Sequence, residues 1–437
     1  MIKYQMEKNL IMYAFVISGI HSGTGKTSIS LAITAALMKR NLKVQPFKVG
    51  PDFIDPSHYS FCEWAVNLDA FMMGEKGVRR SFSKWMKGKD AGIIEGVMGL
   101  FDGYRLSTFS STAHIARILN LPVILVMNVR AMSLSALAVF EGFRSFDRNI
   151  RVAGVIFNNA TEFHLRLKRV FEERGYRVFG AVPKSAVLET ESRHLGLHLG
   201  LEVERDVGAL AELAEEYIDL DGILEISEIQ NEFQEIDEEF EDNGGFKIGI
   251  PFDQAFSFYY RDNLEILKRF GKLEFFSPLR GERAECDMYY IGGGYPELYE
   301  FPEFLRFIKK EALDEKPVYG ECGGMMVLAR KLENRERKRK MAGVLDIDVI
   351  FTDRLQALGY VRGEVIGENP FFQSRFRGHE FHYSYAVPDG DVRFAFKTDG
   401  KGIRDGFDGA LAHNTLAGYT HIHFYSADFS AKLREKV

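Results

Sequence analysis

The chain has 437 residues, which at roughly 100 to 200 residues per domain predicts two or three domains rather than one core. Hydrophobic residues make up 46% and charged residues 27%, proportions that exclude a disordered or fibrous chain. Lys and Arg total 56 against 62 Asp and Glu, so the net charge of −6 excludes a basic surface over the whole protein. We therefore expect no nucleic-acid partner.

The cysteines and the apolar runs favour a cytoplasmic location. Cys62, Cys286 and Cys322 are too few and too scattered for a disulfide framework or a four-thiolate zinc site, which indicates a reducing compartment. No apolar run reaches the roughly 18 residues of a membrane span. Residues 9–20 are followed by polar glycine-rich sequence instead of a signal-peptide cleavage site. We expect no membrane partner.

The first half of the chain has the pattern of an α/β domain. Strands covered by helices on both faces need not alternate apolar with polar residues, so short apolar runs between helical patterns predict a parallel sheet. Such runs occur at residues 14–17, 44–47, 92–97, 122–127 and 152–157.

An acidic stretch divides the chain at residues 219–245, where repeated carboxylates leave little apolar surface to bury. This stretch is a linker or, as an alternative, a solvated acidic helix, and either one places a boundary here. A second strand-helix series follows, with strands expected at residues 247–252, 288–292 and 317–321. The predicted organisation is an N-terminal extension at 1–12, a first α/β domain at 13–222, an acidic linker at 223–245 and a second α/β domain at 246–437. A short basic cluster at 334–340 is expected to be an exposed helix end or loop.

A glycine-rich turn, GIHSGTGKT, lies between the first predicted strand and a helical pattern at residues 29–38. Its backbone N–H groups would converge on one anion, and a nucleotide polyphosphate fits such a nest. The usual spacing G-x-x-x-x-G-K-[ST] is not met, because the first glycine, Gly19, lies one residue earlier. The segment instead resembles the dethiobiotin-synthetase-like branch of P-loop proteins; an ordinary glycine-rich turn is the alternative. The residues predicted to bind ATP here are Gly23, Gly25, Lys26, Thr27 and Ser28, and Thr27 is also predicted to ligate Mg²⁺.

Acids follow two other predicted strands of this half. Asp52 and Glu95 stand where carboxylates that hold a nucleotide-bound Mg²⁺ are expected. Asp55 and Asp102 lie in the loops after these strands and are candidate substrate contacts or further metal ligands. Lys48 would place positive charge where negative charge develops during phosphoryl transfer. The strand-end residues Asn128 and Asn158 are candidate adenine contacts, with a capping role as the alternative.

The second half contains a cysteine in the sequence Gly320-Glu321-Cys322-Gly323-Gly324, between a predicted strand and a helix expected at 325–332. Small residues on both sides permit the strained turn of a nucleophile elbow, and we expect the helix N-terminus to lower the thiol pKa. A buried inert cysteine is the alternative.

Two further motifs supply the other groups that such a cysteine needs. The loop at residues 291–297 and the residue after the cysteine offer backbone N–H groups to an oxyanion, from Gly293, Gly294 and Gly323. His421 and His423 lie on one face of a strand, and either can be the base that activates Cys322; we favour His421.

Taken together, these motifs resemble the cobyrinic acid a,c-diamide synthase family over residues 15–426. In chain order they are GxxxxxGKT, KVGPDFIDP, EGVMGLFDG, RHLGL at 193–197, GGGYPE, YGECGG, GHEFHYS at 378–384, and YTHIHF. The resemblance implies an α/β fold with an N-terminal P-loop (dethiobiotin-synthetase-like) parallel-sheet domain and a C-terminal class I glutamine amidotransferase domain. It places the nucleophile on Cys322 and the catalytic histidine on His421. Class I amidotransferases usually have His-x-Glu, but this chain has His423 at the position of the acid, so no acidic orienter is carried over.

The resemblance also implies a reaction. ATP and Mg²⁺ would activate carboxylates of a corrin-type macrocycle as acyl phosphates, and ammonia from glutamine would convert the a and c acetates to amides. Ni-sirohydrochlorin is the alternative acceptor, another small polycarboxylate is a third, and a MinD-like regulatory ATPase is an alternative of another class. A homodimer is left open as the assembly. Candidate substrate contacts are Arg193 and His194, and candidate substrate or interdomain contacts are His379, Glu380, His382 and Tyr383.

Overall fold

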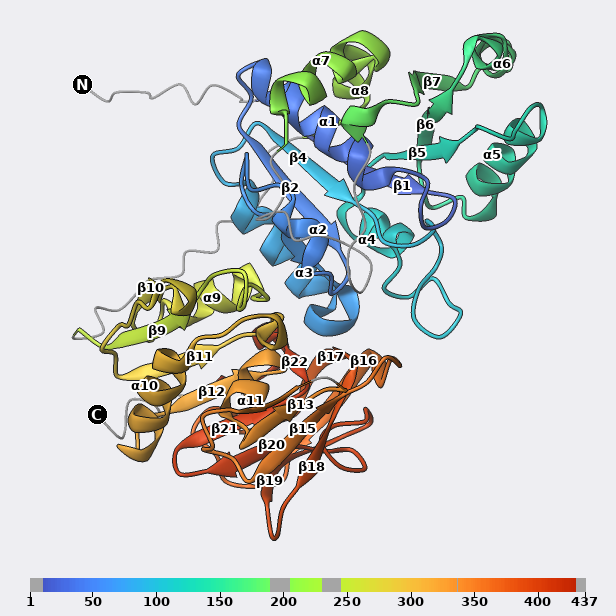
Figure 1. Cartoon of the computed structure of the whole chain (residues 1–437). Coiled ribbons are helices and arrows are strands. Elements are labelled where there is room, and N and C mark those ends of the chain that lie inside the picture. The colour runs from blue at the N-terminus through green and yellow to red at the C-terminus, as the bar shows by residue number, and fades with distance from the viewer. Residues whose placement is uncertain (1–10, 189–204, 230–244, 336, 430–437) are drawn as a thin grey trace, which may run out of the picture. The chain divides into compact units, whose positions relative to one another are not determined.

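The structure is a computed structural model that describes residues 11–188, 205–229, 245–335 and 337–429 (Figure 1). The chain divides into two units. The first comprises Met1–Ala70 and Gly74–Asp237, and the second comprises Phe71–Met73 and Glu238–Val437. Each unit is built on a sheet flanked by helices, which confirms the predicted α/β class.

The first unit contains an eight-stranded sheet in the order β3-β2-β4-β1-β5-β6-β7, with β8 paired to β1. All these pairings are parallel except that of β8, so the predicted parallel sheet is confirmed. Its strands are β1 (Met12–Gly19), β2 (Val44–Val49), β3 (Val66–Leu68), β4 (Ala91–Glu95), β5 (Val123–Asn128), β6 (Val152–Ala160), β7 (Arg177–Pro183) and β8 (Glu228–Ile229). Its helices are α1 (Lys26–Lys39), α2 (Ile54–Ser57), α3 (Ala70–Met86), α4 (Thr112–Leu119), α5 (Ser135–Phe146), α6 (Glu162–Glu173), α7 (Val207–Tyr217) and α8 (Leu220–Ile226).

Helices cover both faces of this sheet. On one face, α1, α7 and α8 share a hydrophobic cluster with residues of β1, β2, β4 and β5 (Figure 1). Val44 of β2 belongs to this cluster, and because side chains alternate along a strand, Phe47 points to the opposite face. There Phe47 contacts Phe82 of α3, with ring centroids 5.1 Å apart. Burial on both faces explains why the strands read as continuous apolar runs in the sequence.

The first part of the acidic stretch at residues 219–245, including the first residues of the linker predicted at 223–245, is folded into the first unit. Leu220 and Ile223 of α8 are buried in the core of the first unit. The next strand, β8, pairs with β1 through Ile229 and Met12. Residues 230–244 of the predicted linker lie outside the described residues, so its remaining part stays a prediction.

The second unit contains a ten-stranded sheet in the order β10-β9-β11-β12-β21-β20-β19-β16-β17-β22 and a four-stranded sheet in the order β14-β13-β15-β18. The strands of the large sheet are β9 (Lys247–Pro251), β10 (Lys272–Phe276), β11 (Met288–Ile291), β12 (Val318–Glu321), β16 (Ala357–Val365), β17 (Phe376–His382), β19 (Arg393–Thr398), β20 (Phe407–Ala412), β21 (Thr415–Gly418) and β22 (His421–Ile422). Those of the small sheet are β13 (Lys331–Glu333), β14 (Lys338–Lys340), β15 (Ile347–Phe351) and β18 (Ser384–Pro388), and the helices are α9 (Arg261–Leu267), α10 (Pro302–Leu313) and α11 (Gly323–Leu328).

Two local predictions in this unit are wrong. The helix expected at 325–332 ends at Leu328, because Leu332 enters strand β13 and pairs with Val349 of β15. The basic cluster at 334–340, expected to be a helix end or loop, contains strand β14, which pairs with β13 in antiparallel register. In the first case pairing with β15 outweighs the local helical pattern, and in the second case the cluster closes a short hairpin with β13.

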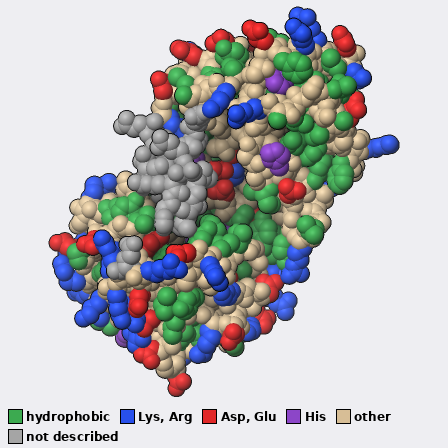
Figure 2. All heavy atoms as spheres, turned by 45° about the vertical axis from the view of Figure 1, so that its right-hand side comes forward, with side chains coloured by type: hydrophobic (Ala, Val, Ile, Leu, Met, Phe, Trp, Pro, Cys, Tyr) green, Lys and Arg blue, Asp and Glu red, His purple; other side chains and the backbone are tan. Residues whose placement is uncertain are grey.

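Charged side chains of both signs occur over the visible surface of each unit, as the near balance of Lys and Arg with Asp and Glu predicts (Figure 2). Among the described residues, no helix is both long enough and apolar enough to cross a membrane.

Candidate functional site

The predicted strand-loop-helix of the nucleotide site is present in the first unit. Strand β1 ends at Gly19 and α1 begins at Lys26. Gly23 and Gly25 have φ angles of 80° and 94°, in the left-handed region that glycine adopts without strain. No side chain among the described residues caps the N-terminus of α1, so the first N–H groups of the helix are left for an anion.

Two asparagines predicted to contact adenine lie at the ends of their strands. Asn158 Nδ2 donates to the carbonyl of Thr24, 2.9 Å away, and so holds the glycine-rich loop. A Cβ on Gly25 would lie 2.1 Å from Asn158 Nδ2, which explains why the loop requires glycine at this position. The Asn128 side chain accepts from the backbone N–H two residues further on, at 3.2 Å. Both asparagines therefore have structural roles, and adenine contact stays a prediction.

A buried cluster of charges lies at the carboxyl ends of β2 and β4, where Lys48 is in register with Glu95. Lys48 Nζ donates to Asp55 and, over 2.8 Å, to Glu95 Oε1. The Thr27 hydroxyl donates to the same oxygen at 2.6 Å, and the Tyr59 hydroxyl donates to Glu95 Oε2 at 2.6 Å. Thus the structure brings together Thr27, Lys48, Asp55 and Glu95, which the sequence singled out. Tyr59 was missed, because no motif marks an isolated tyrosine in the turn after α2.

Burial and charge shift the pKa values of this cluster in opposite directions. Burial and the neighbouring Asp55 raise the pKa of Asp52 to about 7, and burial raises that of Glu95. Burial alone would raise the pKa of Asp55, but Lys48 outweighs it and holds that pKa at about 2. For Lys26, burial and the neighbouring Lys48 lower the pKa to about 8. The raised pKa values of Asp52 and Glu95 show that Lys48 does not fully compensate these two carboxylates, so a further cation would stabilise their charged forms.

The donor set fits Mg²⁺ that is bound together with a nucleotide. Among the described residues, no three His, Cys, Asp or Glu side chains are arranged to hold a metal by themselves. Mg²⁺ at nucleotide sites usually takes one or two protein oxygens and completes its shell with phosphates and water. The Thr27 hydroxyl and the Glu95 carboxylate can supply such oxygens. Asp52 is less available, since its Oδ1 accepts from the backbone N–H groups of residues 54 and 55.

The remaining predicted residues of this half have local partners or cannot be placed. The Ser28 hydroxyl donates to the carbonyl of Leu188 at 2.7 Å. Asp102 Oδ2 accepts from the N–H of Gly99 at 2.8 Å and closes the loop after β4. Arg193 and His194 lie outside the described residues. The ATP role of Ser28 and the substrate roles of the other three therefore stay predictions.

In the second unit, Cys322 occupies the strained turn that the sequence predicts. It stands between β12 and α11 with φ 48° and ψ −98°, a backbone conformation that non-glycine residues rarely adopt. Its N–H donates to the carbonyl of Gly418 in β21, 2.7 Å away. A Cβ on Gly324 would lie 2.1 Å from the carbonyl oxygen of Ile291, so the backbones approach too closely for any side chain. This is the geometry of a nucleophile elbow.

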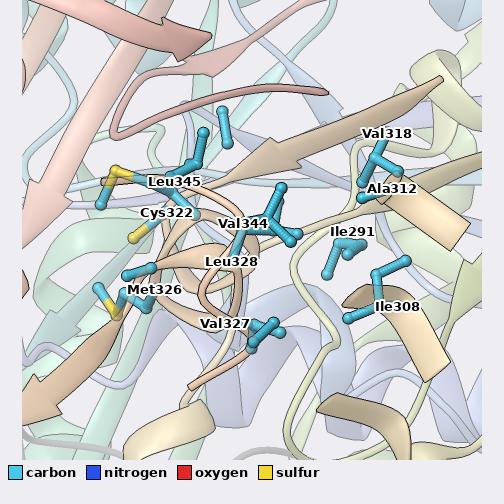
Figure 3. Packing of buried hydrophobic residues seen from close by; sticks show 14 of the residues in the cluster. Ile291, Ile308, Ala312, Val318, Cys322, Met326, Val327, Leu328, Val344 and Leu345 are labelled. Atoms are coloured by element: carbon cyan, nitrogen blue, oxygen red, sulfur yellow. The ribbon is translucent and has the colours of Figure 1, made fainter. Parts of the chain in front are cut away.

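The predicted lowering of the Cys322 pKa is wrong. Cys322 is 6% exposed and belongs to a hydrophobic cluster that includes Met326 and Leu345 (Figure 3). Burial first, and then the negative charge of Glu297, raise the thiol pKa well above its ordinary value. The N–H of Gly323 acts in the other direction, but the N-terminus of a six-residue helix does not offset the loss of solvent.

The glycines predicted to form the oxyanion site lie next to the cysteine. A Cβ on Gly323 would be 3.0 Å from the nitrogen of Gly294, which places the two backbone segments in contact. The N–H of Gly293 is already used, because it donates to the carbonyl of Phe258 at 3.3 Å. Gly294 and Gly323 are therefore the better candidates of the three for binding an oxyanion.

His421 and His423 differ in their surroundings. A Cβ on Gly293 would lie 2.5 Å from His421 Cε1, so the His421 ring faces the glycine segment beside the cysteine. His423 instead has its Nε2 4.0 Å from Asp262 Oδ2, and its ring lies 5.0 Å from that of Tyr260. Burial lowers the pKa of both imidazoles. The geometry supports His421 as the base, in line with the preference from the sequence.

The GHEFHYS motif adds groups near this histidine. His379 stacks on His421 with ring centroids 4.9 Å apart, and its Nδ1 lies 2.8 Å from the Tyr260 hydroxyl. The Glu380 carboxylate accepts from the N–H groups of Lys401 and Gly402, both at 3.0 Å. These contacts lie within the second unit, and a role of the motif toward a substrate stays a prediction.

Comparison with known proteins matches a domain family in each half of the chain. Residues 15–197 match the family model of the CobQ/CobB/MinD/ParA nucleotide binding domain, and residues 247–429 match that of the CobB/CobQ-like glutamine amidotransferase domain. Cobyrinate a,c-diamide synthase of Saccharolobus solfataricus is 40% identical over 431 residues, which cover 94% of this chain and 98% of that protein. The chain belongs to the cobyrinate a,c-diamide synthase family. The protein of the same name from Methanocaldococcus jannaschii is 39% identical, over 95% of this chain and 96% of that protein. The chain is accordingly an ATP-dependent, glutamine-hydrolysing amidoligase.

Proposed function

We propose that the protein converts the a and c acetate side chains of cobyrinic acid to amides, with ATP as the activating substrate and glutamine as the nitrogen donor. The observation that carries the proposal is the similarity over nearly the full chain to proteins of that name. Local geometry supports each half of the chemistry, through the charged cluster at Thr27, Lys48 and Glu95 and the strained turn at Cys322.

In the first half-reaction a carboxylate, which is a poor acyl donor, becomes an acyl phosphate. A substrate carboxylate oxygen attacks the γ-phosphorus of ATP, and ADP leaves. Lys26 and Lys48 would stabilise the negative charge that develops on the phosphoryl oxygens, and the N-terminus of α1 would hold the phosphates. Thr27 and Glu95 would hold Mg²⁺, which neutralises phosphate charge when bound. Buried lysines suit this role, because the low local dielectric strengthens their interaction with the phosphates.

In the second half-reaction glutamine supplies ammonia. The Cys322 sulfur attacks the side-chain amide carbon of glutamine while its proton passes to His421, and the N–H groups of Gly294 and Gly323 would stabilise the resulting oxyanion. His421 returns the proton as the carbon–nitrogen bond breaks and ammonia leaves. Water then hydrolyses the thioester to glutamate. Because burial raises the pKa of Cys322, the thiol must lose its proton during the attack rather than before it. Ammonia attacks the acyl phosphate, and phosphate leaves.

Mass spectrometry of the product tests the proposal. The protein is incubated with Mg-ATP and glutamine and, in separate reactions, with cobyrinic acid or Ni-sirohydrochlorin. We expect the mass change of two carboxylate-to-amide conversions with cobyrinic acid. Conversion of Ni-sirohydrochlorin alone would assign the alternative acceptor. No product from either one, with ATP and glutamine still consumed, would refute both assignments and favour another polycarboxylate.

The same reactions separate an amidoligase from a regulatory ATPase. A regulatory protein would hydrolyse ATP without glutaminase activity, whereas Cys322→Ala would abolish glutaminase activity only if Cys322 acts as proposed. A homodimer and a cytoplasmic location stay predictions.

A further inference from the structure

A buried carboxylate lies beside the proposed base, at a position that the usual amidotransferase pattern does not mark. Glu321 immediately precedes Cys322, and its Oε2 lies 3.8 Å from His421 Nδ1. Both side chains are almost fully buried, with 1% of Glu321 and 2% of His421 exposed. Burial of a carboxylate costs folding free energy unless hydrogen bonds compensate it, and buried titratable groups are frequent at functional sites.

The hydrogen bonds of Glu321 leave one side of its carboxylate open toward this histidine. Oε1 accepts from the Tyr319 hydroxyl at 2.7 Å and from the N–H of Ile422 at 3.0 Å. Oε2 accepts from the Tyr290 hydroxyl at 2.7 Å. A carboxylate oxygen can accept two hydrogen bonds, so among the described residues Oε2 has capacity for one more donor. That oxygen is the one that faces His421 Nδ1.

Three other residues of this region, His379, Glu380 and His423, are less suited to this role. His379 lies face to face with it at an interplanar angle of 17°, so neither ring nitrogen can accept in the plane of the other ring. The Glu380 carboxylate binds the N–H groups of Lys401 and Gly402, and its Oε2 lies 3.9 Å from Nε2 of a different histidine, His382. His423, which stands where the usual acid is expected, has its Nε2 beside Asp262.

We infer that Glu321 is the positioning acid of the glutaminase site, which holds Nδ1 of His421 so that Nε2 is presented to Cys322. The inference rests on the proposed role of Cys322 and His421. Closure of the 3.8 Å gap into a hydrogen bond needs only a small movement, of the kind that accompanies substrate binding at catalytic sites. Because Glu321 and Cys322 are adjacent in the chain, one short segment carries both the acid and the nucleophile. The acid would in turn hold the base, His421, in place.

The charge on Glu321 would also stabilise the imidazolium that forms when His421 takes the thiol proton. Burial raises the pKa of Glu321 to about 7, although its bonds to Ile422, Tyr290 and Tyr319 act in the opposite direction. Burial lowers the pKa of His421, and the nearby His379 and His382 lower it further. Without Glu321, the surroundings of His421 would oppose the protonated form that the mechanism requires.

Labelling with 6-diazo-5-oxo-L-norleucine, a glutamine analogue that alkylates an activated thiol, tests the inference. The rate of modification of the Cys322 peptide is measured by mass spectrometry as a function of pH in the full chain. We expect Glu321→Gln to slow labelling by about a hundredfold or more, as for the loss of a general-base partner. We also expect the labelling rate of Glu321→Gln to rise only at higher pH than that of the wild type. In this variant the thiol must lose its proton without an imidazolium that Glu321 stabilises. Glu321→Asp, which keeps the charge, should recover part of the rate.

Glu311→Gln is the matched control. Glu311 is a buried carboxylate of the same unit that accepts from the Tyr289 hydroxyl at 2.8 Å and pairs with Lys316. Its replacement should lower the unfolding temperature without moving the pH profile of labelling. A wild-type rate and profile in Glu321→Gln, or the same slowing and shift in Glu311→Gln, would overturn the inference. A different result would overturn the proposed glutaminase site itself: no modification of Cys322 in the wild type, with the wild type and Cys322→Ala labelled equally at other residues.

Discussion

Replacement of Lys48 by methionine measures how much its charge contributes to the stability of the proposed nucleotide site. The Lys48 ammonium is 3% exposed and lies among three carboxylates. It pairs with Asp55, lies 2.8 Å from Glu95 and lies 3.9 Å from Asp52. Methionine keeps a chain of similar length and removes the charge, so the carboxylates lose the cation at their centre.

The expected loss of unfolding free energy follows from the burial of Lys48 and its carboxylate partners. Removal of one partner from a buried ion pair destabilises a protein by about 3–5 kcal/mol, because a charge is left without compensation. For a domain of about 150–250 residues each kcal/mol corresponds to about 2–4 °C, so the transition of the first unit should fall by about 6–20 °C. Burial already raises the pKa of Asp52 and Glu95, so protonation will relieve part of the cost at lower pH. The loss should therefore be larger at about pH 8 than at about pH 6.

Thermal unfolding followed by calorimetry at both pH values measures this loss. Lys39→Met is the matched control, since Lys39 is 53% exposed and lies 3.6 Å from Glu212 in a surface pair. A pair of that kind contributes at most about 1 kcal/mol. Added Mg²⁺ should restore more stability to Lys48→Met than to the control, because it can supply positive charge to the same carboxylates. If Lys48→Met unfolded with the control at both pH values, the cluster would not be held together by this charge.

Three further outcomes are expected. Gly25→Ala should weaken ATP binding in calorimetry, because the new Cβ would lie 2.1 Å from Asn158 Nδ2 and the left-handed backbone costs about 1–2 kcal/mol; an unchanged affinity would contradict the loop geometry. Lys48 outweighs the effect of burial and lowers the pKa of Asp55 to about 2, so stabilisation by this carboxylate is present above about pH 4 and is lost as pH falls toward 2. The difference in unfolding free energy between the wild type and Asp55→Asn should therefore narrow over that interval, and a constant difference would count against the ion pair. Cys322→Ala should lose product formation with glutamine and retain it with ammonium salts; loss of both would show that the cysteine is needed for more than ammonia release.

Much of the fold could be predicted from the sequence because the strands of the first unit are buried on both faces. Their apolar runs place β1, β2, β4, β5 and β6 within a few residues of the observed bounds. The glycine positions around Gly25 and Cys322 were informative for a related reason. At these glycines the backbone has a positive φ angle or lies against another backbone segment, and such positions tolerate few residue types.

The errors arise from contacts that the local sequence pattern does not indicate. Strand β14 forms within a basic cluster because it closes a short antiparallel hairpin with β13, which the run of charged residues does not indicate. The Cys322 thiol has a raised pKa because of the cluster around it, whereas its sequence neighbours predict a lowered one. Tyr59 and Glu321 were missed because each lies next to a residue from a distant part of the chain, Glu95 and His421 respectively.

If Lys26 binds the nucleotide as proposed, its lowered pKa would make nucleotide binding depend on pH. Burial and the neighbouring Lys48 lower the pKa of its ammonium group to about 8, so above that pH much of the free protein carries a neutral amine at this position. A polyphosphate in the loop would favour the charged form and draw a proton from solvent. Binding of ATP would then be accompanied by proton uptake, and its affinity would fall as the solution becomes more alkaline.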